Sequence, residues 1–248
     1  MKRQVPGIAL VLVLWYLLAL ALATPVLPLP HLVMARLGQS LAEGRWWLHW
    51  LSSLGRVLGG IGLGLCLALP WGMVSAARTI WGRMSEGLLY LLNPLPKIAF
   101  LPLFMTLLGL GDLSKMVIIA AVVVVPLGLG IRDGTLNLLG TYRDLALTLG
   151  LSRKETIGHI VLPGLVPQVA AGLRLALGMG LSVLFFSENF ATSWGLGYAI
   201  MNSWIMADYT AMYGGIILLS LTGAGLLGMV DSLERRACPW KNPDQARG

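Results

Sequence analysis

Charged residues are scarce in this chain: Asp, Glu, Lys and Arg together make up 12% of its 248 residues. Soluble domains carry about 25% charged residues. Hydrophobic residues account for 56% of the chain and the mean hydropathy is +0.78, so water could not solvate the surface of a globule with this composition. We therefore expect an integral membrane protein. Because a helix needs about 20 apolar residues to cross a bilayer, the length allows five or six crossings.

Cysteine and histidine are also few and scattered. Cys66 lies far from Cys238, and His31, His49 and His159 are isolated from one another. Neither set makes a metal-binding or redox pattern, and we interpret the histidines as ordinary interfacial or loop residues. The sequence therefore predicts no metal and no cofactor in this chain.

The motifs of several enzyme classes are missing. The sequence has no GxxxxGK[ST], HExxH, GxSxG or CxxC segment, which excludes ATP binding through a P-loop and gives no support to hydrolase or redox chemistry. Ser187 and Ser193 lack a suitable base nearby. The net charge of +7 comes without a basic patch interleaved with aromatic residues, so nucleic acid is not an expected partner. We predict that the chain is not an enzyme.

Long apolar runs dominate what is present. Six runs are long enough to be crossings, at residues 8–27, 51–77, 87–110, 115–131, 169–187 and 209–230. The third run contains Pro94, Pro96 and Pro102, which predict a broken segment. In the second run, Gly60 and Gly64 are spaced for close packing between helices. The predicted fold class is an all-α polytopic membrane protein with six transmembrane helices.

The basic residues indicate an orientation. With the N-terminus inside, most of the 18 Lys and Arg residues fall in inner loops and the C-terminal tail, as the positive-inside rule requires. Both termini and the polar segment 133–174 are then cytoplasmic, and the Trp-containing segment 31–50 lies on the outer surface. The first run has features of a secretory signal, but we expect the protein to keep it as its first helix.

The polar segment 133–174 has the sequence pattern of two short capped helices. Thr141 followed by Asp144 has the form of a capping box that would begin the first helix, and Gly150 would end it in the left-handed conformation. Ser152 with Glu155 repeats the capping pattern and would begin the second helix. Such an element favours docking of a soluble partner, with a plain connecting loop as the alternative.

The same segment carries a motif that resembles a known family. The chain reads DLA at 144–146, then Gly150, then IVLP at 160–163. This spacing resembles the EAA loop of bacterial ATP-binding-cassette (ABC) importer permeases, whose pattern is Glu-Ala-Ala, three residues, Gly, nine residues, Ile-x-Leu-Pro. All spacings match. Two identities differ, since Asp144 replaces Glu and Leu145 replaces Ala, and each keeps the chemical type.

Other short motifs extend the resemblance over roughly residues 30–241. PKIAFLPLF at 96–104, GLGD at 109–112, GLGY at 195–198 and LERR at 233–236 with Pro239 and Trp240 are similar to the nitrate/sulfonate/taurine branch of the family. The resemblance implies the type I importer fold, with a first transmembrane helix and periplasmic segment over 1–49, a permease domain over 50–231 with its coupling helices at 141–163, and a cytoplasmic tail over 232–248.

The resemblance also implies partners and coupling residues. These partners are two ATPase subunits that bind ATP and Mg, a solute-binding protein, membrane lipid of the bacterial inner membrane and a second copy of the permease. The implied ATPase-coupling residues are Tyr142, Arg143, Asp144, Ala146, Gly150, Ile160, Leu162 and Pro163. Among them, Gly150 would set the turn and Pro163 would end the lever. Asp144 would either contact the ATPase or cap its own helix.

Four polar residues are candidates for the translocation path: Lys97, Glu188, Asn189 and Asn202. Lys97 could instead snorkel to the inner interface, and the other three could be interfacial residues that face water. The expected cargo is a small solute of the nitrate, sulfonate, taurine or thiamine-precursor kind. The alternative function is an ion-gradient-driven carrier, which typically has intramembrane carboxylates and an inverted repeat.

Overall fold

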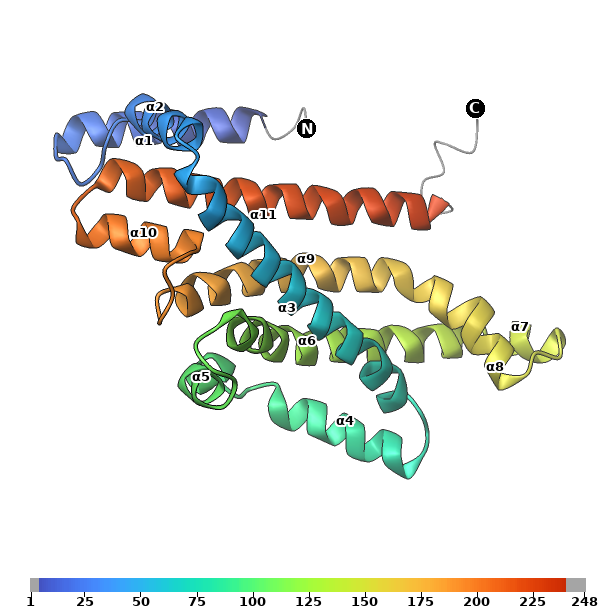
Figure 1. Cartoon of the computed structure of the whole chain (residues 1–248). Helices are drawn as coiled ribbons and strands as arrows, with labels where there is room; N and C mark the ends of the chain where they lie inside the picture. Colours follow the sequence, from blue (N-terminus) through green and yellow to red (C-terminus); the bar gives the residue numbers. More distant parts are fainter. Residues whose placement is uncertain (1–4, 240–248) are drawn as a thin grey trace. The chain divides into compact units, whose positions relative to one another are not determined.

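The computed structural model describes residues 5–239, and within that range the regular structure is entirely helical (Figure 1). The long helices are α3 (Arg45–Ser75), α6 (Asp112–Thr141), α9 (Leu162–Glu188) and α11 (Tyr209–Ala237). The shorter helices are α1 (Val5–Leu22), α2 (Pro30–Ala42), α4 (Ile80–Leu92), η1 (Lys97–Phe100), α5 (Leu101–Leu108), α7 (Arg143–Thr148), α8 (Arg153–Thr156), η2 (Ile157–Val161) and α10 (Leu196–Ile205). The basic residues predicted to be cytoplasmic at positions 2, 3, 241 and 247, and Trp240, lie outside the described residues.

Among the described residues, four helical stretches are long and apolar enough to cross a bilayer: α3, α6, α11 and the run Arg153–Glu188. The pair formed by α4 and the stretch Lys97–Leu108 adds a fifth if it counts as one span. The first predicted crossing, over 8–27, is a shorter apolar helix that ends at Leu22. It stops there because the next residue, Ala23, has a φ of +45°, outside the right-handed helical region. The sixth crossing stays a prediction.

The described helices form two compact units. One unit holds the chain up to Gly55 together with Phe185–Thr222. Within it, the Trp15 indole donates to the carbonyl oxygen of Pro28 at 3.1 Å, and its ring lies 5.5 Å from that of Tyr213. These contacts attach α1 to the residues that precede α2 and to α11.

The other unit holds Arg56–Leu184 and the chain from Gly223 onward. Its hydrophobic core draws on four helices: Ala68 of α3, Leu89 of α4, Val123 of α6 and Leu165 of α9 are all at most 1% exposed. Burial of a valine or leucine side chain stabilises a fold by about 1.5–3 kcal/mol in water, whereas between bilayer helices close van der Waals packing has the larger share.

Glycines bring α3 and α6 into close contact in this unit. A Cβ atom at Gly60 would lie 2.6 Å from the Cβ of Ile119, and one at Gly64 would lie 2.4 Å from the Cγ2 of Val123. Both distances are too short for any side chain. The interpretation of these glycines as packing positions is therefore confirmed.

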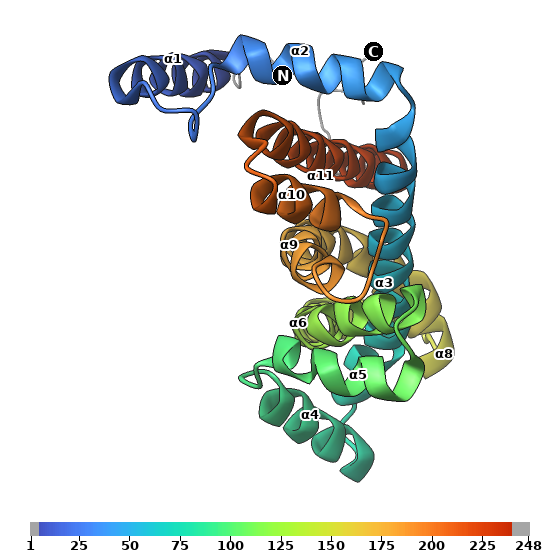
Figure 2. The same ribbon diagram turned by 60° about the vertical axis from the view of Figure 1, so that its left-hand side comes forward.

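The proline-containing run is broken, as predicted. α4 and the stretch Lys97–Leu108 meet at 87°, and both views place α5 against the first turns of α6 (Figures 1 and 2). The predicted start of this run at residue 87 is wrong. α4 begins at Ile80, because the Thr79 hydroxyl caps it by accepting the N–H of Gly82 at 3.1 Å.

The helix that contains the fourth predicted crossing extends past residue 131, since α6 continues to Thr141 and spans 30 residues. Polar residues there lie on the helix rather than in a loop. Arg132 pairs with Glu86 of α4 and with Asp133, and its guanidinium carbon lies 5.6 Å from the centre of the Tyr90 ring. These partners allow a charged residue to stay on a helix that is otherwise apolar.

Candidate functional site

The predicted capping box at Thr141 is absent. Thr141 is the last residue of α6, and Tyr142 precedes α7 without a capping side chain. Tyr142 donates its N–H to Leu138 at 3.0 Å and accepts from the N–H of Ala146 at 3.0 Å, so one residue closes the first helix and opens the next. A side-chain cap needs an extended residue at this position, and the backbone of Tyr142 is not extended. The prediction that Thr141 and Asp144 cap the helix is therefore wrong, and Asp144 lies exposed in the first turn of α7.

Gly150 ends α7 as predicted. Its φ is +65°, in the region that favours glycine. The Gly150 N–H donates to Leu147 O at 3.1 Å and the Leu151 N–H to Ala146 O at 3.0 Å, which together form a Schellman motif. Ala146 is buried beneath this turn at 8% exposure. The turn between the two short helices is thus fixed by backbone geometry.

The second capping box is confirmed. The Ser152 N–H donates to Glu155 Oε2 at 2.8 Å, and the Glu155 N–H donates to Ser152 Oγ at 3.4 Å. The Ser152 hydroxyl also lies 2.6 Å from Glu155 Oε2. These reciprocal bonds satisfy donors that the first turn of α8 would otherwise leave without a partner.

Pro163 does not end the second helix. α8 passes through the π-helical turn η2 into α9, and Arg153–Glu188 forms a single run of 36 residues. A π turn changes the hydrogen-bond register, and a proline in the first turn of the α-helix that follows loses no bond within that helix. Val161 and Leu165 are buried at 0% and 1% exposure, so the helix enters the core at this point.

The structure brings several predicted coupling residues together. Tyr142, Arg143 and Ala146 line a hollow of about 170 Å³ that is also lined by Arg153 of α8. Ile160 lies in the π turn, and Leu162 and Pro163 are exposed at the start of α9. α7 and α8 therefore both line this hollow. α8 continues into α9 as a single helical run.

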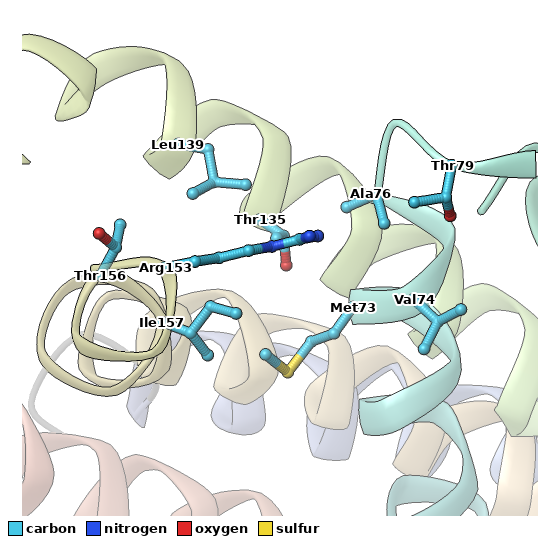
Figure 3. A pocket seen from close by; sticks show the side chains of 10 residues that line it. Met73, Val74, Ala76, Thr79, Thr135, Leu139, Arg153, Thr156 and Ile157 are labelled. Carbon is cyan, nitrogen blue, oxygen red and sulfur yellow. The ribbon is translucent and has the colours of Figure 1, made fainter. Parts of the chain in front are cut away.

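Two larger cavities adjoin this hollow, with volumes of about 540 and 530 Å³. Figure 3 shows the first of them, where the Arg153 side chain extends from α8 across the space between α6 and the end of α3. Sequence reasoning missed these cavities and the part of Arg153 in them, because the pattern of capping residues indicates where helices begin and end but not which space lies between them.

The predicted path residues differ in their surroundings. Lys97 is half-buried and its Nζ donates to Asn93 O at 3.1 Å. Asn189 is half-buried, and its Oδ1 has no hydrogen-bond partner among the described residues. Asn202 is exposed on α10. Glu188 is 0% exposed, so the alternative that it faces water is wrong.

Glu188 lies at the centre of a polar cluster that sequence reasoning missed. Its carboxylate accepts from the Ser53 hydroxyl at 2.8 Å and from the Gly197 N–H at 2.8 Å. Ser53 Oγ in turn accepts the Leu196 N–H at 2.7 Å. A Cβ atom at Gly195 would lie 2.4 Å from the Glu188 Cδ, and Gly195 has φ +143°. The GLGY motif thus supplies two glycines that allow the backbone to approach a buried carboxylate.

Two arginines on the long helices have acidic partners on other helices. Arg56 lies 2.7 Å from Asp112 at the start of α6. Arg174 of α9 lies 2.8 Å from Asp231 and also pairs with Glu234, both on α11. Within residues 5–239, no group of three or more His, Cys, Asp or Glu side chains is placed to hold a metal. These pairs act as links between helices.

Comparison with known proteins decides the family. The sequence model of the family described as "Binding-protein-dependent transport system inner membrane component" matches residues 60–237, which is more than half of the chain. The chain belongs to this family. It is therefore a membrane component of an ABC importer, and the permease function predicted from the sequence is confirmed.

Several permeases are similar to this chain over most of its length. The taurine transport system permease protein TauC of Escherichia coli (strain K12) is 27% identical over 94% of this chain and 87% of TauC. The putative aliphatic sulfonates transport permease protein SsuC of Bacillus subtilis (strain 168) is 26% identical over 88% of this chain and 79% of SsuC. The formylaminopyrimidine transport permease protein ThiX of Halalkalibacterium halodurans is 24% identical over 94% of this chain and 93% of ThiX.

Proposed function

We propose that this permease is driven by a separate ATPase that docks on α7, Gly150 and α8, and that it carries a small organic solute delivered by a binding protein. The names of the relatives support cargo of the taurine, aliphatic sulfonate or thiamine-precursor kind. Nitrate is the further class that the sequence motifs favour. ATP and Mg belong to the ATPase, and the permease itself hydrolyses nothing.

One observation carries the proposal: the docking segment is helically continuous with a long apolar helix. α8 begins at a capping box and passes without a break into α9. A displacement of α8 by a partner would therefore move the first part of α9, instead of being absorbed by a flexible loop. The Schellman turn at Gly150 holds α7 in place beside α8.

The remaining parts of the proposal follow from the topology. With six crossings and both termini in the cytoplasm, the segment 141–163 faces the compartment that contains ATP. Two copies of the permease would enclose the path, and each would engage one ATPase subunit. Asp144 lies exposed beside the predicted interface, which supports a contact with the ATPase rather than a cap.

The test uses proteoliposomes that contain the permease, its ATPase and its binding protein, and measures solute uptake and ATP hydrolysis together. Gly150→Pro removes the N–H that bonds to Leu147 and imposes a negative φ. Gly44→Pro is a matched control, because Gly44 also has a positive φ, +79°, and its N–H donates to Leu41 O at 3.1 Å. Gly44 lies between α2 and α3, outside the docking segment.

We expect Gly150→Pro to lower the ratio of solute transported to ATP hydrolysed at least tenfold, because the geometry between α7 and α8 is lost. Gly44→Pro should leave that ratio within about twofold of wild type, since it changes a turn with a similar positive φ that lies outside the docking segment. An unchanged ratio in Gly150→Pro, in protein that remains in the membrane, would contradict docking at this segment.

A further inference from the structure

The two large cavities form one groove at the end of α3. We call it the arginine groove, and its two halves share five lining residues: Ala76, Ala77, Thr79, Leu139 and Arg153. The walls come from the end of α3, from α6 and from α8. Each half encloses more than 500 Å³, which is within the range of small-molecule sites. The groove is therefore large enough for a ligand rather than a single water or ion.

The two halves of the arginine groove differ in chemistry. The first half is mostly apolar, with Met73, Val74 and Ile157 in its lining. The second half adds Arg78 and Arg143 to the shared Arg153. Figure 3 shows Arg153 reaching across the apolar half, with Thr135 and Ala76 on the far side. A ligand that fits both halves has an anionic group and an apolar portion.

In the part of the chain that the structure describes, no carboxylate lines either half of the groove. Three nearby acidic residues are engaged elsewhere, since Glu86 and Asp133 pair with Arg132 and Glu155 bonds to Ser152. Asp144, which follows the lining residue Arg143, is exposed on α7 and is not part of the lining. Among the ion pairs found within residues 5–239, none includes Arg78, Arg143 or Arg153. The groove thus collects positive charge that the described part of the chain does not neutralise.

We propose that the arginine groove binds an anionic phospholipid of the inner leaflet, with its phosphate between the arginines and an acyl chain along the apolar half. Basic pockets at the cytoplasmic ends of transmembrane helices suit lipid headgroups of this kind, and guanidinium groups match phosphate geometry. The inner-leaflet position rests on the orientation given under the proposed function. A free inorganic anion would leave the apolar half uncovered, which favours the lipid.

The surroundings of the groove agree with a position at the membrane boundary. α4 begins directly after Thr79, and its first residues, Ile80 and Trp81, are 67% and 72% exposed. Exposed tryptophans are typical of the interfacial belt. A lipid in this position would contact α3, α6 and the docking helix α8 at once, and would thereby hold α8 against the core.

The test measures lipid binding directly on the full-length permease in a neutral maltoside detergent, by native mass spectrometry with dioleoylphosphatidylglycerol or dioleoylphosphatidylcholine. Arg78→Ala with Arg153→Ala removes two groove charges. Arg83→Ala with Arg236→Ala is the matched control, because both residues are exposed and lie outside the groove lining. Leu139→Trp adds bulk where the two halves of the groove meet and keeps every charge. Inorganic phosphate, added at millimolar concentration, tests for a free-anion site.

We expect wild type to bind phosphatidylglycerol at least tenfold more tightly than phosphatidylcholine. The groove double variant should weaken phosphatidylglycerol binding roughly 30-fold, the scale of two arginines at an anionic surface, whereas the control double variant should change it less than about threefold. Leu139→Trp should weaken lipid binding without a change in net charge. Phosphate alone should not displace the lipid.

Equal binding of the two lipids by wild type would overturn the proposal, as would equal losses in the groove and control variants. Displacement of the lipid by phosphate would assign the groove to a soluble anion instead. Because lipid binding is measured without an ATPase, a negative result here does not depend on whether the ATPase docks at α7 and α8. If wild type keeps its preference for phosphatidylglycerol and Gly150→Pro still transports normally, the docking proposal is contradicted and the lipid proposal is not.

Discussion

The Ser53 hydroxyl donates to the buried Glu188 carboxylate at 2.8 Å and at the same time accepts the Leu196 N–H at 2.7 Å. One small side chain of α3 therefore links the end of α9 to the start of α10. The arrangement satisfies a carboxylate that is 0% exposed, which would otherwise carry a large desolvation cost. The Gly197 N–H donates to the same carboxylate at 2.8 Å.

The Glu188 cluster predicts a strong effect of removing the carboxylate. Glu188→Ala leaves the Ser53 hydroxyl and the Gly197 N–H buried without this acceptor, which costs about 1–3 kcal/mol for each group. We expect the melting temperature of the detergent-solubilised protein to fall by several degrees. Asn202→Ala, at an exposed position of α10, should leave it nearly unchanged. Equal melting temperatures for both variants would remove Glu188 from this structural role.

Gly195 should not tolerate a side chain. Its φ is +143°, and a Cβ atom at this position would lie 2.4 Å from the Glu188 Cδ, so Gly195→Ala must displace either the carboxylate or the backbone. We expect lower yield of folded protein and a lower melting temperature. Gly225→Ala offers a control within α11, because a Cβ there meets nothing within 4 Å and alanine favours a helix by about 1 kcal/mol. A well-folded Gly195→Ala variant would show that the cluster rearranges easily.

Arg174 should link α9 to α11 through its two acidic partners. Asp231 and Glu234 are three residues apart on one helix face, and the side chains of Arg174 and Glu234 are 35% and 9% exposed. Because the pair is partly solvated, we expect Arg174→Gln to destabilise the protein by about 1 kcal/mol or less. The exchanged pair Arg174→Glu with Glu234→Arg should recover part of that loss. No recovery in a double-mutant cycle would indicate that the pair contributes nothing.

The capping box at α8 predicts a local effect on dynamics. Ser152→Ala removes the acceptor of the Glu155 N–H, so the first turn of α8 should open more often. Hydrogen exchange at residues 153–156 should speed up several-fold, while exchange in α6 stays the same. Lys154→Ala is a suitable control, because it lies in the same turn and contributes no capping bond. Similar exchange in both variants would contradict the stabilising role of the box.

The sequence predicted those parts of the proposed docking segment that depend on local backbone chemistry. Gly150 ends α7 because only glycine adopts its positive φ without cost, and Ser152 with Glu155 caps α8 because both partners lie within one turn. Thr141 fits the same pattern, but α6 does not end before it. The pattern identifies residues that are able to cap, whereas the preceding helix decides whether a cap is needed.

The errors in the sequence predictions have a common physical cause. Arg132 and Asp133 suggested a loop, yet Arg132 stays on α6 because Glu86 of another helix pairs with it. Pro163 suggested a break, yet a π turn accommodates it. The alternative that Glu188 faces water failed for a similar reason, because Ser53 and Gly197 satisfy its carboxylate inside the protein. In each case the partner is distant in sequence or depends on hydrogen-bond register, so residue type alone could not reveal it.

The orientation and exposure of α7 provide the most direct test of the ATPase-docking account. Leu147 is 69% exposed on this helix, so Leu147→Cys, in a protein whose Cys66 and Cys238 are replaced by serine, gives a single reporter thiol. We predict that a membrane-impermeant maleimide labels it in inside-out vesicles stripped of the ATPase and not in intact cells, and that adding the ATPase back protects it. Labelling in intact cells, or unchanged labelling with the ATPase bound, would contradict the account.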